Sequence, residues 1–376
     1  MFKNCVTVIE IGSSKLSAIV ASAGINNTFN IHAKASVEYA GFFEGDFVEK
    51  TGLESAVEAL LGQIRSTYKK NIQKIYVGVP AEFSKVVTLS EKLSFSHKQT
   101  ITQRDLDALS NQASEKINAD GMEILSINPI SYVLDNDRKT NSPLKLKANM
   151  IMAELSIILA QSSFIQTFNR IWSKFGILQV EYLSEPLCEA LMVLEKEERD
   201  RTCIVIDVGA RTTSIAFTKG DGLTNLTSFS LGGSHITSDL SEACGISYAD
   251  ARNLKKEIVL SLKGGENDFY QFSLLSGRYV KIPLKFVNEV AMYRIDMIAD
   301  TTNECIRLFA KEFVPYYPIY LSGAGLSKIR GGKDYFAKCI NRNISYGVPP
   351  IPAMDKPENA SLLGLVDYAL KQSKRA

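Results

Sequence analysis

The chain has 376 residues, of which 45% are hydrophobic and 22% charged, a composition typical of soluble globular proteins. It exceeds the roughly 250–300 residues at which a single hydrophobic core stops growing, so at least two domains are expected. Its 43 Lys and Arg against 41 Asp and Glu leave a net charge of +2, which gives no electrostatic basis for binding nucleic acid.

The cysteines and histidines exclude two further classes of site. Six cysteines and three histidines are dispersed along the chain, without a C-x-x-C pair. This pattern indicates reduced thiols in a cytoplasmic protein, not a disulfide framework or a zinc site. No apolar run reaches the 18 residues or so that a transmembrane helix needs.

The first 80 residues predict one α/β half. Residues 5–11 and 16–22 are β-rich runs around the turn GSSK, and a third strand is expected at 30–39. A helix over 53–69 follows from its apolar spacing, and KIYVGVP at 74–80 is a short strand closed by proline.

Residues 81–168 predict a small α+β unit inserted into this half. The strand-like runs VVTLSEKLSF, EILSINPISYVLD and NMIMAELSIILA surround one helix, with Thr102 as its N-cap and Asp105 three residues on. Two helices are expected after it, at 162–175 and 185–198. We therefore expect a first subdomain made of 1–80 and 169–198.

The second half of the chain repeats the acidic hairpin with which the first half begins. IDVGARTTSIAF at 206–217 is a near-copy of VIEIGSSKLSAIV at 8–20. After it we expect a helix over about 236–243, a β-hairpin within 264–285, a long amphipathic helix over 284–312 ended by Pro315, and a strand running into SGAG. The expected subdomains are 199–240 plus 318–376, and a smaller one at 241–317.

The two acidic hairpins predict a shared ligand site. Each places a carboxylate, Glu10 or Asp207, two residues before a glycine that ends an apolar strand. Backbone amides at such turns hold phosphate oxygens, and carboxylates hold a hydrated divalent cation. Either turn alone has a purely structural reading, but together with GGSH and SGAG they predict a nucleoside triphosphate with Mg²⁺.

The order of these motifs resembles the FtsA family of bacterial actin-like cell-division proteins. The motifs are EIGSSK, EPLCEALMVL, VIDVGARTTS, LGGSHITSDLSEACGISYADARNLKKE and IYLSGAGL, and the likeness covers nearly the whole chain. KIYVGVPAEF leads into the small subdomain that FtsA and its pilus-assembly relative PilM carry. The resemblance implies an α/β, actin-like, ribonuclease-H-like duplicated ATPase fold with an inserted α+β subdomain in its first half.

The resemblance also implies the residues of an ATP site. Those expected at the nucleotide are Gly12, Ser13, Ser14, Lys15, Gly209, Ala210, Arg211, Thr212, Thr213, Gly232, Gly233, Arg252, Lys255, Gly323, Ala324 and Gly325. Glu10 and Asp207 are expected at Mg²⁺.

Four of these positions depart from the family pattern. Glu10 stands for aspartate, Ala210 and Arg211 for glycines, and Arg252 for a glutamate. Arg211 either clamps the γ-phosphate or fills the phosphate site. We expect weakened ATP binding and at most a weak ATPase, and no residue is assigned as a general base.

The partners are likewise those that the resemblance implies. It predicts a scaffold that self-associates into filaments and binds the FtsZ C-terminal tail near Arg294, at the inner face of the cell membrane at the division site. The helix around Arg294 also has the apolar spacing of a core helix, with Arg294 expected to be exposed while its neighbours pack. Family members continue to a basic amphipathic helix, whereas this sequence ends at YALKQSKRA, so we expect membrane attachment through a partner or through a helix absent from this sequence. The alternatives are a PilM-like pilus platform and a small-molecule kinase with the same fold.

Overall fold

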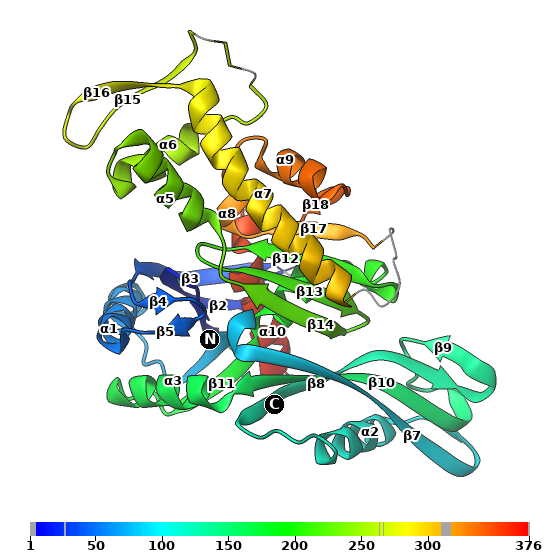
Figure 1. Cartoon of the computed structure of the whole chain (residues 1–376). Helices are drawn as coiled ribbons and strands as arrows, with labels where there is room; N and C mark the ends of the chain where they lie inside the picture. The colour runs from blue at the N-terminus through cyan, green and yellow to red at the C-terminus, as the bar shows by residue number, and fades with distance from the viewer. Residues whose placement is uncertain (1–4, 26–27, 263, 266, 310–316, 375–376) are drawn as a thin grey trace.

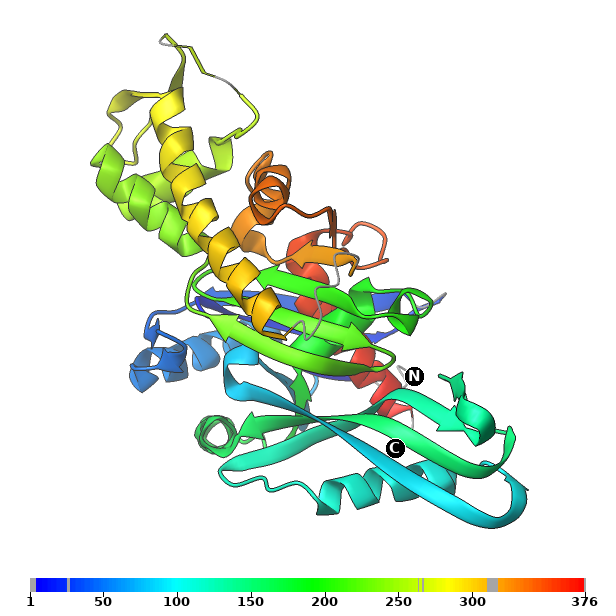
Figure 2. The same ribbon diagram turned by 45° about the vertical axis from the view of Figure 1, so that its right-hand side comes forward.

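The computed structural model describes residues 5–25, 28–262, 264–265, 267–309 and 317–374. Within them two five-stranded sheets form the centre of the molecule, and a four-stranded sheet extends to one side. Figures 1 and 2 show the first half of the chain below, the second half above, and the inserted unit at the lower right.

The first sheet has the strand order β11–β6–β1–β2–β3. Its strands are β1 (Cys5–Ile11), β2 (Lys15–Ala23), β3 (Phe29–Glu38), β6 (Lys74–Val79) and β11 (Gln179–Ser184). Strand residues alternate between two cores because successive side chains point to opposite faces. Ile9 and Ile11 pack with helices α1 (Lys50–Thr67) and α3 (Ser162–Lys174), while Val6 and Val8 pack with α10 (Ala360–Ser373). The strands and helix predicted for residues 5–80 are confirmed.

The inserted unit has the strand order β7–β10–β8–β9. Its strands are β7 (Ser84–Thr100), β8 (Met122–Leu134), β9 (Arg138–Thr140) and β10 (Lys147–Gln161). Helix α2 (Gln103–Glu115) covers one face through Leu109 and Ala113. The predicted cap is confirmed: the Thr102 backbone N–H donates to the Asp105 carboxylate over 2.8 Å.

The predicted end of this unit at residue 168 falls inside α3. The apolar face of α3, with Phe164, Phe168 and Trp172, packs in the core of the first sheet. We therefore propose that the inserted unit ends at Gln161, where β10 ends.

The second sheet repeats the first, with the order β14–β13–β12–β17–β18. Its strands are β12 (Cys203–Val208), β13 (Thr213–Lys219), β14 (Gly222–Phe229), β17 (Ile319–Ser322) and β18 (Ile344–Tyr346). As in the first sheet, an antiparallel hairpin is followed by a parallel neighbour: β12 pairs with β13 and with β17, as β1 pairs with β2 and with β6. Helices α5 (Gly233–Cys244), α7 (Leu284–Phe309) and α9 (Gly332–Ile340) cover its outer face.

Helices α4 (Glu185–Val193) and α10 join the two halves. Cys188 of α4 packs in the core that α10 shares with the first sheet, and Leu187 packs against the second sheet. The two helices cross at Gly364, where a Cβ atom would lie 2.4 Å from the Cys188 carbonyl oxygen. Only glycine permits so close an approach of the two helices, which join the two halves of the molecule at this point.

The outer part of the second half carries α6 (Tyr248–Glu257) and a hairpin of β15 (Phe269–Ser273) and β16 (Tyr279–Pro283). The predicted hairpin is thus confirmed. Helix α5 begins at Gly233, three residues before the predicted start, and the proposed boundary at 240 lies inside it. The predicted end of α7 near Pro315 lies outside the described residues. No helix in the described part of the chain is long and apolar enough to cross a bilayer.

Candidate functional site

The turns of the two hairpins have the same backbone geometry. The Gly12 N–H donates to the Lys15 carbonyl over 3.0 Å, and the Gly209 N–H donates to the Thr212 carbonyl over 2.9 Å. Glu10 pairs across its hairpin with Ser17, and Asp207 with Ser214. The two carboxylates therefore occupy equivalent positions, one in each half.

The two turns meet across the cleft. The backbone N–H of Arg211 donates to the Ser13 hydroxyl oxygen over 3.0 Å. Gly323, which precedes the short helix α8 (Ala324–Ser327), has a φ of +78°, and a Cβ there would lie 1.9 Å from Asp207 Oδ1. A Cβ on Gly325 would lie 2.6 Å from the Gly209 carbonyl oxygen. These glycines let a third turn, at 323–325, approach the second turn, at 209–212, until their backbones are in contact.

A cleft of about 570 Å³ lies between the turns, a volume in the range of small-molecule sites. Most of the predicted residues line it: Glu10, Gly12, Ser13, Ser14, Lys15, Asp207, Gly209, Ala210, Arg211, Thr212, Gly233, Arg252, Lys255, Gly323, Ala324 and Gly325. Two do not. Thr213 is buried in β13, where its hydroxyl donates to the Leu231 carbonyl over 2.7 Å. Gly232 lies behind the second turn, since a Cβ there would lie 2.8 Å from the carbonyl oxygens of Gly209 and Ala210.

The floor of the cleft carries acids that sequence reasoning did not assign. Glu185 and Glu189, at the start and in the middle of α4, line the cleft with Glu10 and Asp207. Three of the carboxyl oxygens are shielded from solvent and accept no hydrogen bond from the described residues: Asp207 Oδ1, Glu185 Oε2 and Glu189 Oε1. Both glutamates belong to the motif EPLCEALMVL, which the sequence analysis used only as evidence of the family resemblance.

Burial and mutual repulsion perturb these acids. Burial, followed by the charges of Glu10 and Glu82, raises the pKa of Asp207 from 3.8 to about 7. Burial and the charges of Glu10 and Asp207 raise the pKa of Glu185 well above its ordinary value. Burial and repulsion therefore disfavour the ionised carboxylates, and a bound cation would favour them.

Residues 5–374, apart from their undescribed gaps, contain no cluster of three His, Cys, Asp or Glu side chains placed to hold a metal by themselves. Mg²⁺ is commonly held by one or two carboxylates together with the phosphates of a substrate. The unpartnered oxygen of Asp207 fits that role, because carboxylate oxygen is the ligand type that Mg²⁺ prefers.

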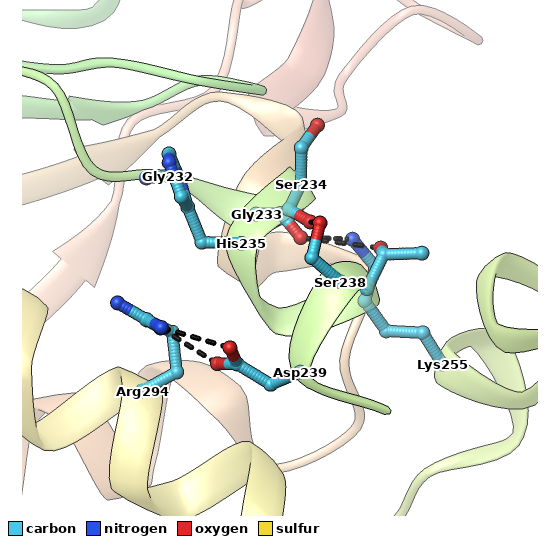
Figure 3. A network of polar contacts seen from close by, with 9 residues as sticks. Gly232, Gly233, Ser234, His235, Ser238, Asp239, Lys255 and Arg294 are labelled. Carbon is cyan, nitrogen blue, oxygen red and sulfur yellow. Dashed lines mark hydrogen bonds and ion pairs between the residues drawn. The ribbon is translucent and has the colours of Figure 1, made fainter. Parts of the chain in front are cut away.

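Lys255 lies at the edge of the cleft, where α6 faces α5. Its ammonium group donates to the Gly233 carbonyl over 2.7 Å (Figure 3). Burial, with repulsion by Arg252, lowers the pKa of Lys255 to about 8. The cation is thus held beside the N-terminus of α5, on the wall of the cleft.

Arg294 is not an exposed residue as the sequence suggested. Its guanidinium forms a two-point ion pair with Asp239 of α5, at 2.6 and 2.8 Å, and the two side chains are 19% and 25% exposed (Figure 3). The pair ties α7 to α5, and this contact satisfies part of the hydrogen-bonding capacity of Arg294. A role for Arg294 in binding a partner remains a prediction.

Two family models match the chain. The model for cell division protein FtsA matches residues 204–364, and the model for the SHS2 domain inserted in FtsA matches residues 84–159. The second match covers most of the inserted sheet and α2.

Full-length relatives agree with these models. Cell division protein FtsA of Bacillus subtilis is 19% identical over 370 residues, covering 97% of this chain and 83% of the relative. The FtsA protein of Staphylococcus epidermidis is 20% identical over 386 residues, covering 96% of this chain and 78% of the relative.

Solved structures show the fold. A chain of the PilM–PilN type IV pilus biogenesis complex aligns with a TM-score of 0.63 at 17% identity, covering 97% of this chain and 98% of that one. MreB5 of Spiroplasma citri bound to AMPPNP aligns with a TM-score of 0.58 at 16% identity, covering 99% and 98%. With its duplicated sheets, paired phosphate-type turns and matched insertion, this chain belongs to the FtsA family and has the actin-like ATPase fold.

Proposed function

We propose that the protein is an FtsA-like cell-division scaffold that binds ATP with Mg²⁺ in the cleft, assembles with itself and recruits FtsZ. The observation that supports this best is the pairing of two equivalent acidic turns, one from each half, around a cleft of about 570 Å³. A ligand held by both turns would couple its presence to the relative position of the halves. Family membership suggests a location in the cytoplasm, at the inner face of the cell membrane at the division site.

The nucleotide would use the groups that face the cleft. The amides of the two turns, 12–15 and 209–212, would hold phosphate oxygens, as backbone N–H groups do at such turns. Asp207 would hold Mg²⁺ or its water, with Glu10 opposite it. Lys255 would face the ribose and base, and the glycines of 323–325 would leave room for the adenosine.

Hydrolysis is expected to be weak at most. Glu185 is one of three acids of the cleft with an unpartnered oxygen, and it is our candidate general base for an attacking water. Burial and the charges of Glu10 and Asp207 raise its pKa well above the ordinary value, and only an ionised carboxylate can accept a proton. Mg²⁺, by favouring the ionised acids, would be needed before Glu185 acts.

The surface proposed for the FtsZ tail is the exposed side of α7. Phe286, Tyr293 and Met297 are 41%, 68% and 37% exposed, and their successive spacings are seven and four residues, so they form one stripe on the helix. Their neighbours Ile295 and Ile298 are buried, as expected of the opposite face. An apolar stripe of this kind suits a short peptide with hydrophobic anchors.

Two other functions were considered on the same fold. The likeness to a chain of the PilM–PilN complex favours a pilus platform that binds a peptide of a membrane protein. A small-molecule kinase would need a pocket for its acceptor, and among the described residues the inserted unit reaches the cleft only through Ala81 and Glu82.

Isothermal titration with ATP and Mg²⁺ tests the nucleotide proposal. We expect micromolar binding to the wild type and about tenfold weaker binding to Asp207→Asn, with Asp120→Asn, an exposed aspartate of the inserted unit, as the matched control. Repeating the titration with Arg211→Gly separates the two readings of Arg211: weaker binding marks a phosphate clamp, and tighter binding marks a blocker. No heat of binding in any variant would contradict the nucleotide proposal.

A peptide with the sequence of the FtsZ C-terminal tail from the same organism tests the partner proposal. We expect Tyr293→Ser to weaken its binding about tenfold in fluorescence anisotropy, with Leu178→Ser, which removes an exposed apolar side chain in the first half, as the control. Binding of an N-terminal peptide of a pilus membrane protein instead would favour the PilM-like alternative.

A further inference from the structure

Two of the arginines that depart from the family pattern reach across the cleft. Arg211 belongs to the second turn, yet its guanidinium donates to the carbonyl of Phe42 in the first half. Arg252 belongs to α6 of the second half, and its guanidinium pairs with Glu38 at the end of β3.

The acceptor for Arg211 is held by a rigid support. Phe42 belongs to a small hairpin of β4 (Phe42–Phe43) and β5 (Asp46–Phe47). The Phe42 ring packs edge-on against Phe47 with centroids 5.2 Å apart, and Phe47 stacks on Phe83 at 5.4 Å. Because these rings are buried in the core of the first half, the Phe42 carbonyl is a fixed point for the arginine to bind.

The second contact lies at the mouth of the cleft. Arg252 donates to both oxygens of Glu38, Nη1 to Oε2 over 3.0 Å and Nη2 to Oε1. This paired geometry is the one that a guanidinium and a carboxylate prefer. The side chains are 51% and 63% exposed, so water and salt weaken the pair, and its contribution is modest.

Two further contacts join the second turn to the first half. The backbone N–H of Arg211 donates to the Ser13 hydroxyl oxygen. Burial raises the pKa of Glu82, and a hydrogen bond with Thr212 opposes this shift. The second turn is thus bound to the first half at three places, all on the wall of the cleft.

We propose that Arg211 and Arg252 act as ties that hold the two halves together across the cleft, and that they favour this closed arrangement also without nucleotide. Opening the cleft would break the contacts to Phe42 and Glu38, whereas the α4–α10 crossing and the apolar packing of β14 against the inserted unit would still join the halves. An anionic ligand that reaches Arg211 would compete with the Phe42 carbonyl for its guanidinium. This last step rests on the proposed ATP binding, whereas closure of the empty protein does not.

Fluorescence energy transfer across the cleft, in the full chain and without nucleotide, tests the ties. Non-natural amino acids at Glu58 and Lys281 would carry the dyes; both positions are exposed, on α1 and β16, which lie on the same side of the molecule in different halves (Figure 1). We expect one short-distance population in the wild type. Arg252→Glu should lower the ratio of closed to open molecules by roughly two- to fivefold, and Arg211→Met by roughly tenfold.

The controls separate loss of a tie from loss of structure. The charge swap Glu38→Arg with Arg252→Glu should restore the short distance. Arg307→Glu, which breaks an equally exposed pair with Glu304 within α7, should leave it unchanged. Unchanged distances in both Arg211→Met and Arg252→Glu, or an open wild type, would overturn the proposal.

A second arm adds ATP and Mg²⁺ to the variants. Closure of the open variants by ATP supports the ties and the nucleotide site together. If the variants open but ATP has no effect, the ties stand and the proposed ATP binding fails.

Discussion

Replacement of Asp207 by asparagine is expected to stabilise the empty protein while it weakens the nucleotide site. Burial and neighbouring acids raise the pKa of Asp207 from 3.8 to about 7, so the folded state binds this proton more tightly than the unfolded state. The folded carboxylate therefore costs stability once the pH exceeds 3.8, and the cost grows until the pH passes about 7. A difference of about three in pKa between the two states lowers the free energy of unfolding by about 4 kcal/mol at pH 8, and by less than half of that at pH 5.

Thermal unfolding of Asp207→Asn at pH 5 and pH 8 measures this cost. Asparagine removes the charge but keeps a polar group in place, so we expect about 2–4 kcal/mol of added stability at pH 8. For a chain of this length that corresponds to a rise in Tm of about 3–5 °C. The rise should be smaller at pH 5, and Asp120→Asn should show neither effect. An equal change in Tm at both pH values would refute the reasoning, because it would show that the Asp207 carboxylate carries no pH-dependent cost.

Three further changes test the packing around the cleft. Gly364→Ala places a Cβ 2.4 Å from the Cys188 carbonyl oxygen, so urea unfolding should show a loss of about 2–4 kcal/mol in the free energy of unfolding. The control is Gly62→Ala in α1, where no atom lies within 4 Å of the new Cβ, and it should gain up to about 1 kcal/mol of stability. Gly323→Ala, which would put a Cβ 1.9 Å from Asp207 Oδ1 at a φ of +78°, should abolish ATP binding in titration calorimetry while the protein stays folded by circular dichroism. Lys255→Met should weaken binding of ATP and of adenosine alike by about tenfold; a loss confined to ATP would place Lys255 at the phosphates instead.

The sequence was most informative about features that depend on residues close together in the chain. The two hairpins followed from strand runs interrupted by short glycine turns, and their equivalence followed from the spacing of Glu10 and Asp207 from those glycines. The long helix α7 followed from its apolar period. These features depend on residues a few positions apart, so their patterns are legible without the fold.

What could not be predicted depends on residues far apart in the chain. The apolar period of α3 predicts a helix but does not say which core it enters, so the boundary at 168 cut through it. Arg294 looked exposed because its partner, Asp239, lies 55 positions away. Glu185 was passed over because a glutamate at the start of a helix is ordinary; only its unpartnered oxygen beside Asp207 marks it.

The acids and the arginines of the cleft have opposite effects on the empty protein. Glu10, Glu185, Glu189 and Asp207 repel one another on the cleft floor and disfavour a closed, dry cleft. The cross-cleft contacts of Arg211 and Arg252 offset that repulsion. If the two arginines act as ties, removing them should increase the dependence of closure on ATP.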